Sequence, residues 1–546
     1  MPEVRGSKKD QLPMPWKPLP FPLPVVPPRF TPQTAAARNR KLAQQLYAQF
    51  FSWPIERSVR ILETTPPEVW ECEGQRRALH VFHEAAERVP AYKDFLKKHK
   101  VNHEKVRTIK DFQTVPIMDK KNYLRRYSLD ELCWDGVLST TQLTSVSSGS
   151  TGEPFFWPRG SLLELEITYL FELLLDFFDL RRKPTLFINA FAMGMYVGGP
   201  FTLNAMLRIA QKGGIVEIVT PGYALEEILR VTPVLGRQFK QVILASYPPF
   251  AKTIIDEGRR RGIDWRRLNV RFLLAGEGFN ETWRDYVCEL SGRIDPVTDF
   301  LDLYGTADAA VLGFETPLSI RLRRVVSQIT HGAKEVFGEE RLPALLQYMP
   351  TLRYFEQSQR ELFFTTGSTG IPLVRYDIHD YGGTVPYKEF TGRADANGWA
   401  RFARGRNWRI PFVYLFGRSD FTAILYGANV YPENIKAALE DRRVRRFFTG
   451  RFTMWTETDR FQDQFLLVNI ECADGVRPAS RLRRDVRKVI VETLLNVNSE
   501  YRVVARAIGR KTRPKVRLLP KGDPRYFAGG IKHRWNKKKQ SQQLSE

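Results

Sequence analysis

The sequence predicts a large α/β domain with a parallel-rich sheet, followed by a small α+β domain. Short β-rich runs alternate with helical stretches from about residue 184, which is the pattern of βαβ units. After Arg418 the chain becomes more basic, and strand-like runs are followed by a long helical stretch. The length of 546 residues, 43% of them hydrophobic, allows two or more sizeable cores.

The amino-terminal segment is rich in proline. Residues 1–32 contain ten prolines, which prevent a regular helix and favour an extended conformation. We therefore expect residues 1–33 to form a proline-rich arm or linker. Helical patterning begins directly afterwards in TAAARNRKLAQQLYAQFFSW, so the large domain is predicted over residues 34–418.

The middle of the chain supplies the predicted parallel strands. The runs TLFINAF, GGIVEIVT, KQVILAS and VRFLLAGEG are separated by helical stretches such as FTLNAMLRIAQK and FAKTIIDEGRRRG. In parallel sheets, ligands bind in the crevice beyond the carboxyl ends of the strands. We therefore expect binding residues in the loops that directly follow these runs.

The carboxyl-terminal segment is predicted to be a small basic domain over residues 419–546. It contains the strand-like runs TAILYG, FTMWTE and FLLVNIE and the helical stretch SRLRRDVRKVIVETLLNV. From Tyr501 onward there are 14 Lys+Arg and 2 Asp+Glu, a net charge of 14 − 2 = +12. This is half of the excess of the whole chain, which is 84 − 60 = +24.

So large a positive excess favours polyanionic partners. No zinc-finger spacing or RNA-binding aromatic signature accompanies it, so we expect no specific nucleic-acid recognition, while nonspecific contact with a polyanion or a membrane surface stays open. The four cysteines lie far apart without a C-x-x-C pair, which argues against a disulfide framework or a thiolate zinc site. Without a secretory signal pattern, we expect a cytoplasmic protein.

A loop rich in Ser, Gly and Thr carries the sharpest local signal. It reads SVSSGSTGEP over residues 145–154, between a strand-like run and a later helical run. Such a loop offers backbone N–H groups and hydroxyl donors that can close around phosphate oxygens. It lacks the spacing of a Walker A loop, and a similar string at 365–372 shows that an ordinary turn is an alternative.

Five motifs follow one another along the chain. They are SSGSTGEP at 147–154, LYGTAD at 303–308, LVRYDIHD at 373–380, GRSD at 417–420 and GIK at 530–532. In their residues and their order they resemble the motifs of adenylate-forming enzymes, most of all those of the phenylacetate-CoA ligase branch. The resemblance covers roughly residues 75–535. It implies a large nucleotide- and substrate-binding domain, a hinge and a small mobile lid domain.

The resemblance also implies a nucleotide site. The loop would hold the ATP phosphates through Ser147, Ser148, Gly149, Ser150, Thr151 and Gly152. Tyr304, Gly305 and Thr306 would line the adenine and the α-phosphate. Asp308, together with Thr151, would bind Mg²⁺, because hard carboxylate and hydroxyl oxygens suit that ion.

Further residues complete this implied site. Asp380 would accept hydrogen bonds from the ribose hydroxyls, and Arg418 would be a second nucleotide contact at the domain junction. Gly276 and Glu277 would face the adenine. Asp420 would be the hinge, and Lys532 would be a catalytic lysine carried by the moving domain.

The sequence departs from the family pattern at three positions. Glu153 replaces a lysine in the phosphate loop, Asp308 replaces a glutamate, and Phe421 replaces a second acidic hinge residue. A carboxylate beside a triphosphate costs about 1 kcal/mol when it is solvated. Either a basic group elsewhere or Mg²⁺ would compensate, or the nucleotide would bind differently.

The segment INAFAMGMYVGG is similar to the acid-binding segment of the branch. Phe191, Met193 and Tyr196 in this segment, and Tyr247 further on, would form a soft apolar wall that suits an aryl or other flat acid. Core packing explains these residues equally well.

The resemblance therefore implies an AMP-forming carboxylate–CoA ligase that uses ATP, Mg²⁺ and coenzyme A. One alternative is an adenylyltransferase without the CoA step, as in the deazaflavin-cofactor and capsule-associated members of the branch. A second alternative is a degenerate member that binds nucleotide without catalysis. A homodimer is expected only by analogy, and the sequence does not identify the acid.

Overall fold

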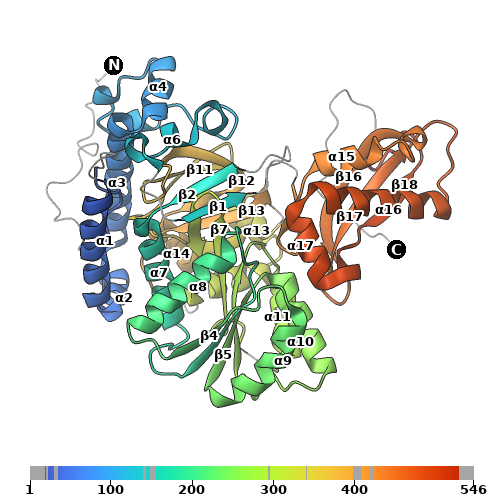
Figure 1. Ribbon diagram of the computed structural model, residues 1–546, viewed down its shortest axis with the longest axis horizontal. Helices are drawn as coiled ribbons and strands as arrows, with labels where there is room; N and C mark the ends of the chain where they lie inside the picture. The colour runs from blue at the N-terminus through green and yellow to red at the C-terminus, as the bar shows by residue number, and fades with distance from the viewer. Residues whose placement is uncertain are drawn as a thin grey trace.

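The computed structural model describes residues 19, 23–29, 35–138, 143–147, 155–292, 295–339, 341–396, 407–418 and 422–527. Figure 1 shows two parts, a larger one built around a twisted sheet and a smaller one at the carboxyl-terminal end of the described chain. We call residues 35–418 the N-terminal lobe and residues 422–527 the C-terminal lobe. The predicted boundary between 418 and 419 adjoins residues outside the description and stays a prediction.

One sheet of eleven strands organises the N-terminal lobe, in the order β10-β11-β12-β13-β9-β8-β7-β6-β5-β3-β4. The strands are β3 (Thr185–Asn189), β4 (Val216–Val219), β5 (Gln241–Ser246), β6 (Val270–Ala275), β7 (Phe300–Thr306), β8 (Ala310–Phe314), β9 (Ala344–Gln347), β10 (Tyr354–Ser358), β11 (Glu361–Thr366), β12 (Leu373–Val385) and β13 (Phe412–Arg418). The α/β prediction is confirmed, and the four β-rich runs are the strands β3 to β6.

The sheet has a parallel half and an antiparallel half. Strands β4, β3, β5, β6 and β7 pair in parallel. The pairings β7–β8, β8–β9, β9–β13, β13–β12, β12–β11 and β11–β10 are all antiparallel. The antiparallel half was not predicted, because β9, β10, β11 and β12 follow one another without helices between them. A separate hairpin, β1 (Leu143–Ser147) with β2 (Phe155–Arg159), flanks residues 148–154.

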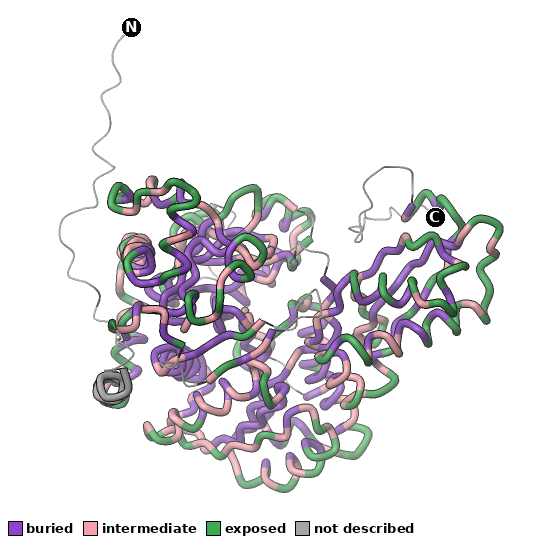
Figure 2. The backbone as a smooth tube through the Cα atoms, turned by 45° about the horizontal axis from the view of Figure 1, so that its top comes forward, coloured by how far each residue is buried: buried purple, intermediate pink, exposed green. Residues whose placement is uncertain are grey.

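Helices cover both faces of the parallel half. On β3 and β5, Phe187 and Ile243 point to the face covered by α7 and α8, while Leu186 and Leu244 pack with α10 and α11 on the other face. The helices of this lobe are α1 (Ala35–Ser52), α2 (Ile55–Thr64), α3 (Pro67–Arg88), α4 (Pro90–Lys98), α5 (Ile109–Phe112), α6 (Leu129–Leu132), α7 (Ser161–Asp176), α8 (Gly198–Gln211), α9 (Leu225–Leu235), α10 (Pro248–Arg260), α11 (Glu281–Leu290), α12 (Pro317–Ser327), α13 (Gly332–Phe337) and α14 (Tyr387–Ala396). Both faces are therefore buried, as Figure 2 shows.

The C-terminal lobe has its own sheet and core. Strands β16 and β17 pair antiparallel, and β18 joins β17 in parallel. The elements are β14 (Ala423–Leu425), β15 (Ala428–Val430), α15 (Pro432–Leu439), β16 (Phe448–Thr458), β17 (Gln464–Cys472), α16 (Ser480–Val497), α17 (Ser499–Ile508) and β18 (Lys515–Leu519). Apolar residues of all these elements form one cluster that is distinct from the large sheet.

The described part of the proline-rich arm packs against the N-terminal lobe. Leu23, Val25 and Val26 are buried, and the Arg88 guanidinium donates to the carbonyl oxygens of Pro27 and Pro28 at 2.7 and 2.9 Å. The extended arm thus finds hydrogen-bond donors on α3 in place of a regular partner strand. In the part of the chain that the structure describes, no helix is both long and apolar enough to cross a membrane.

Candidate functional site

Predicted binding residues lie together where the parallel strands end. Tyr247 directly follows β5, Gly276 directly follows β6, and Phe191 lies two residues beyond β3. The last pair in register between β6 and β7 comes directly before Gly276 and Tyr304. Because parallel strands present their carboxyl ends at one edge, the fold brings these four positions to the same edge.

Asp380 and Arg418 belong to different motifs but face each other in the register of β12 and β13. Asp380 is 7% exposed and accepts a hydrogen bond from the hydroxyl of Tyr304 on β7. A buried carboxylate is stable only with donors around it. The fold therefore gathers Tyr304, Asp380 and the backbone position of Arg418 from three separate motifs.

Asp308 is 5% exposed, and both of its carboxylate oxygens have partners. The Tyr376 hydroxyl donates to Oδ2 at 2.6 Å, and the Lys120 ammonium donates to Oδ1 at 3.3 Å. This arrangement does not fit a metal ion, because the ion would have to displace the ammonium group. Among the described residues, no group of three or more His, Cys, Asp and Glu side chains could hold a metal. The metal role of Asp308 stays a prediction.

Lys120 also connects Asp308 with the start of the predicted phosphate loop. Its ammonium lies 5.7 Å from the centre of the Trp157 ring, and Trp157 Nε1 donates to the Ser147 hydroxyl at 3.1 Å. Trp157 and Ser147 belong to the two strands that flank residues 148–154. We did not predict Lys120 from the sequence, because no motif contains it and its contact with Asp308 spans 188 residues.

Buried arginines hold the turn that carries Asp308. Arg159 Nη2 donates to the carbonyl of Ala307 at 2.7 Å, and Arg353 Nη2 donates to the carbonyl of Ala309 at 3.0 Å. The Thr306 hydroxyl accepts from the Ala309 N–H at 3.1 Å. Burial lowers the pKa of Arg159 to about 9, which leaves it a cation at neutral pH. The two guanidinium groups of Arg159 and Arg353 thus hold the backbone on both sides of Asp308.

The Tyr247 ring fills the space between the two lobes at this edge. It makes an edge contact with Phe191 at 5.2 Å and stacks on Tyr223 at 5.6 Å. Gly276 and Gly427 lie against it with φ values of 89° and 84°, and a Cβ atom on them would come within 2.6 and 2.7 Å of the ring. Tyr247 therefore occupies the space beside Gly276, and the adenine-facing role of Gly276 stays a prediction.

Glu277 contacts the C-terminal lobe. It is buried, accepts from the Gly427 N–H, and accepts from Gln464 Nε2 at 2.5 Å. Burial raises its pKa to about 8, although both hydrogen bonds favour the carboxylate. The residue predicted to face adenine is thus part of the contact between the lobes in this structure.

The remaining residues of the acid-binding prediction are less buried. Met193 is half-buried, and its sulfur lies 3.8 Å from the side-chain amide of Asn189. Tyr196 is half-buried near Ser499 on α17, and burial raises the pKa of its phenol. A Cβ atom on Gly305 would make only an ordinary contact of 3.6 Å, so packing alone does not require glycine there.

A group of charged side chains also joins the two lobes. Lys252 on α10 is 1% exposed at its side chain and lies 2.7 Å from Asp256 and 2.8 Å from Asp463. Lys511 binds the same Asp463 carboxylate at 3.0 Å. Because breaking a buried ion pair leaves an uncompensated charge, this group favours the observed arrangement of the lobes.

Several predicted residues lie outside the described part of the chain. They are Ser148, Gly149, Ser150, Thr151, Gly152 and Glu153 of the loop, Asp420 and Phe421 of the hinge, and Lys532. Only the backbone of Arg418 is described. Their predicted roles are neither supported nor opposed by the geometry.

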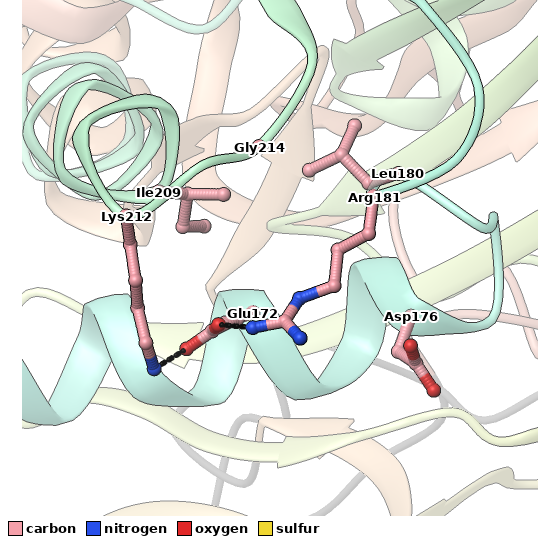
Figure 3. A pocket seen from close by; sticks show the side chains of 7 residues that line it. All are labelled: Glu172, Asp176, Leu180, Arg181, Ile209, Lys212 and Gly214. Carbon is pink, nitrogen blue, oxygen red and sulfur yellow. Dashed lines mark hydrogen bonds and ion pairs between the residues drawn. The ribbon is translucent and has the colours of Figure 1, made fainter. Parts of the chain in front are cut away.

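Figure 3 shows a small pocket lined by residues of α7, α8 and the segments that follow them; its empty volume of about 280 Å³ includes open solvent. Glu172 on α7 binds Lys212 at 2.8 Å and Arg181 at 3.0 Å. Both cations that line the pocket are therefore already paired, and the buried Glu172 is compensated. Ion pairs within the N-terminal lobe therefore account for the charged groups Glu172, Lys212 and Arg181 in this pocket.

Comparisons with known proteins agree with the motifs. No family model matches the chain. The phenylacetate-coenzyme A ligase of Thermus thermophilus is 22% identical over 387 residues, which cover 69% of this chain and 77% of that protein. Among solved structures, a 2-hydroxyisobutyryl-CoA ligase in complex with 2-HIB-AMP and CoA has a TM-score of 0.60 at 16% identity, covering 87% of this chain and 91% of that one.

The structural likeness extends over nearly the whole of both chains, so it concerns the complete fold and not one lobe. The curated relative is a member of the branch to which the five motifs point. The family prediction made from the sequence is confirmed. The chain has the fold of a CoA ligase of the adenylate-forming type and is similar in sequence to a phenylacetate-coenzyme A ligase.

Proposed function

We propose that this protein is an AMP-forming carboxylate–CoA ligase, which converts an aryl or acyl acid to its acyl-adenylate and then to its CoA thioester. The observation that supports this most is the position of Lys120 between Asp308 and Trp157. It places a cation beside two nucleotide motifs that lie far apart in the sequence. The resemblance to a phenylacetate-CoA ligase supports the same reaction class.

Adenylate formation needs positioning and charge stabilisation more than a nucleophilic side chain. Asp380, buried beside Tyr304, would accept from the ribose hydroxyls. Lys120 would turn from Asp308 toward the phosphates and stabilise the charge that develops there. It would also offset Glu153, where the family loop carries a lysine. Mg²⁺ is expected to arrive with ATP, and no step is assigned to a metal at Asp308.

The acid would lie against the apolar group at the strand ends. Phe191 and Tyr247 present flat, buried surfaces, and Met193 is adaptable in shape. This wall suits a flat or compact apolar acid, with the carboxylate toward the nucleotide. Lys532 and the hinge at Asp420 remain part of the proposal, as do a homodimer and a cytoplasmic location.

Acid-dependent exchange of labelled pyrophosphate into ATP tests the first step. A panel of aryl and aliphatic acids should reveal exchange that depends on the acid, and Asp380→Asn should reduce it by weakening ribose binding. CoA consumption with the best acid then tests the second step. Exchange without CoA consumption would favour the adenylyltransferase alternative. ATP binding without exchange would leave only the degenerate alternative.

A further inference from the structure

Helix α16 presents an outward side that consists almost entirely of cations. Its inward side packs in the core of the C-terminal lobe through Val486, Val489, Ile490 and Leu494. The exposed charged residues on its outward side are Arg481, Arg483, Arg484, Asp485, Arg487 and Lys488. Five cations thus accompany one carboxylate within residues 481–488.

The turn after α15 extends this surface. Arg443 in the turn binds Glu492 on α16 at 2.6 Å, and the neighbouring Val444 is buried in the same core as α16. These two contacts hold the turn beside the helix. The exposed arginines of the turn are Arg442, Arg445 and Arg446. We call these three arginines and the five cations of α16 the basic surface.

Pairing within the protein does not account for the basic surface. Arg481, Arg484 and Arg487 have no side-chain hydrogen bond or ion pair with any residue that the structure describes, and the same holds for Arg442 and Arg445. Like charges three or four positions apart destabilise a helix. Because the cations of α16 stand at such spacings, they do not serve the stability of the helix that carries them.

The shape of the basic surface argues against a nucleic acid as its partner. A helix with its side chains is about 10–12 Å wide, so it fills a major groove of about 12 Å by itself. Helix α16 packs along α15, which would prevent its insertion into such a groove. Single strands bind by stacking their bases on aromatic rings. Phe447, the aromatic residue at the end of the turn, is half-buried, and the Arg446 guanidinium lies over its ring at 4.7 Å.

The surface of an anionic lipid bilayer fits the basic surface better. Its headgroups move laterally, so they can approach cations that stand at irregular spacings on a helix and a turn. Clusters of about four to eight Lys and Arg residues on a helix are typical of binding to anionic lipids. The basic surface has eight cations, with Asp485 as the one carboxylate among those of α16.

The position of the basic surface would leave the candidate site uncovered. Figure 1 shows α16 on the outer part of the smaller lobe and α17 nearer to the N-terminal lobe. Ser499, the first residue of α17, lies near Tyr196 of the N-terminal lobe. A bilayer against the outward side of α16 would therefore not cover the edge of the sheet at which Tyr247 lies.

We propose that the basic surface binds the anionic face of a lipid bilayer, with the arginines of α16 and of the neighbouring turn in contact with lipid phosphate groups. The contact is electrostatic and peripheral, so no helix enters the bilayer. This inference does not rest on the proposed ligase reaction, because it concerns a different face of the protein and is tested without turnover.

Sedimentation with lipid vesicles tests the proposal. The full chain should bind vesicles made of equal parts of phosphatidylcholine and phosphatidylglycerol, and it should not bind vesicles of phosphatidylcholine alone. Raising the salt concentration from about 0.1 M to about 1 M shortens the Debye length from about 10 Å to about 3 Å and should release the protein. Equal binding to both kinds of vesicle would refute an electrostatic contact.

Neutralisation of two arginines identifies the surface. Each Lys or Arg near an anionic bilayer strengthens binding about fivefold, so Arg481→Gln with Arg484→Gln should weaken it about 25-fold. Arg237→Gln with Arg259→Gln is the matched control, because it removes the same charge from exposed positions of the N-terminal lobe. Circular dichroism and thermal unfolding check that both variants are folded.

Three results would overturn the proposal. If the α16 variant binds the anionic vesicles as tightly as the wild type, the basic surface is not the contact. If the control variant loses as much affinity as the α16 variant, the net charge of the whole protein accounts for the binding. If the wild type binds duplex RNA or DNA more tightly than the anionic vesicles at the same salt concentration, the partner is a nucleic acid and not a bilayer.

Discussion

Replacement of Gly427 by alanine tests how the lobes meet. Gly427 lies in the turn between β14 and β15, and its φ of 84° costs about 1–2 kcal/mol for a residue with a Cβ atom. The new Cβ would lie 2.7 Å from the Tyr247 ring, whereas ordinary contact begins at 3.4 Å, so the ring must move by 3.4 − 2.7 = 0.7 Å. Overpacking of this kind costs about 1–3 kcal/mol. The variant should therefore weaken this contact by about 2–5 kcal/mol.

Hydrogen exchange in the β14–β15 hairpin measures this loss directly. Opening should become about 30-fold to several-thousand-fold more frequent in Gly427→Ala. Gly450→Ala is the matched control, because its φ is 82° and nothing lies within 4 Å of the added Cβ atom. Adding Tyr247→Ala to Gly427→Ala should restore part of the protection by removing the clash. If Gly427→Ala opens the hairpin no more than the φ cost alone, Tyr247 does not set this contact and our reasoning fails.

Three further changes give distinct outcomes. Lys120→Met should lower the rate of acid-dependent pyrophosphate exchange about 10- to 100-fold, because it removes the cation beside Asp308. Lys121→Met, a change at an exposed position, should leave the rate unchanged. Equal exchange rates in the two variants would refute the role of Lys120. The raised pKa of Glu277 means that the folded state favours the protonated acid, so the contribution of Glu277 to stability should be fully present below about pH 4.5 and be lost as the pH rises through about 8. Urea unfolding across this range should lose that slope in Glu277→Gln, and an unchanged slope would contradict the assignment. Lys252→Met should lower the free energy of unfolding in urea by about 1–3 kcal/mol. This is less than the loss of a whole buried ion pair, because Asp463 keeps its ion pair with Lys511. An unchanged free energy of unfolding would show that this group of ion pairs does not stabilise the fold.

The parallel half of the sheet could be predicted because its sequence signal is local. Each of the four β-rich runs is a short apolar stretch, and each is followed by a helix long enough to show its own period. Phe191, Tyr247, Gly276 and Tyr304 were predicted from the resemblance, and they lie at the edge where the parallel strands end, which is where ligands bind in such sheets. The antiparallel half has no such alternation, so its strand order could not be predicted.

The contacts of the site depended on tertiary structure. The link from Lys120 to Asp308 joins two segments whose separation no local pattern encodes. The same holds for Glu277, where the sequence shows a carboxylate after a strand and the structure shows that it accepts hydrogen bonds from Gly427 and Gln464. Periodicity reports which face of an element is buried, but it does not report which distant element covers that face.

The amino-acid sequence alone was sufficient for the α/β class, the family and the edge of the sheet at which the motifs end, because motif order and hydrophobic period are properties of neighbouring residues. Only the tertiary structure decided that a lysine pairs with the buried Asp308 and that the Tyr247 ring lies against both Gly276 and Gly427. These features arise where surfaces from separate parts of the chain meet. Their energies depend on distance and burial, which a linear sequence does not contain.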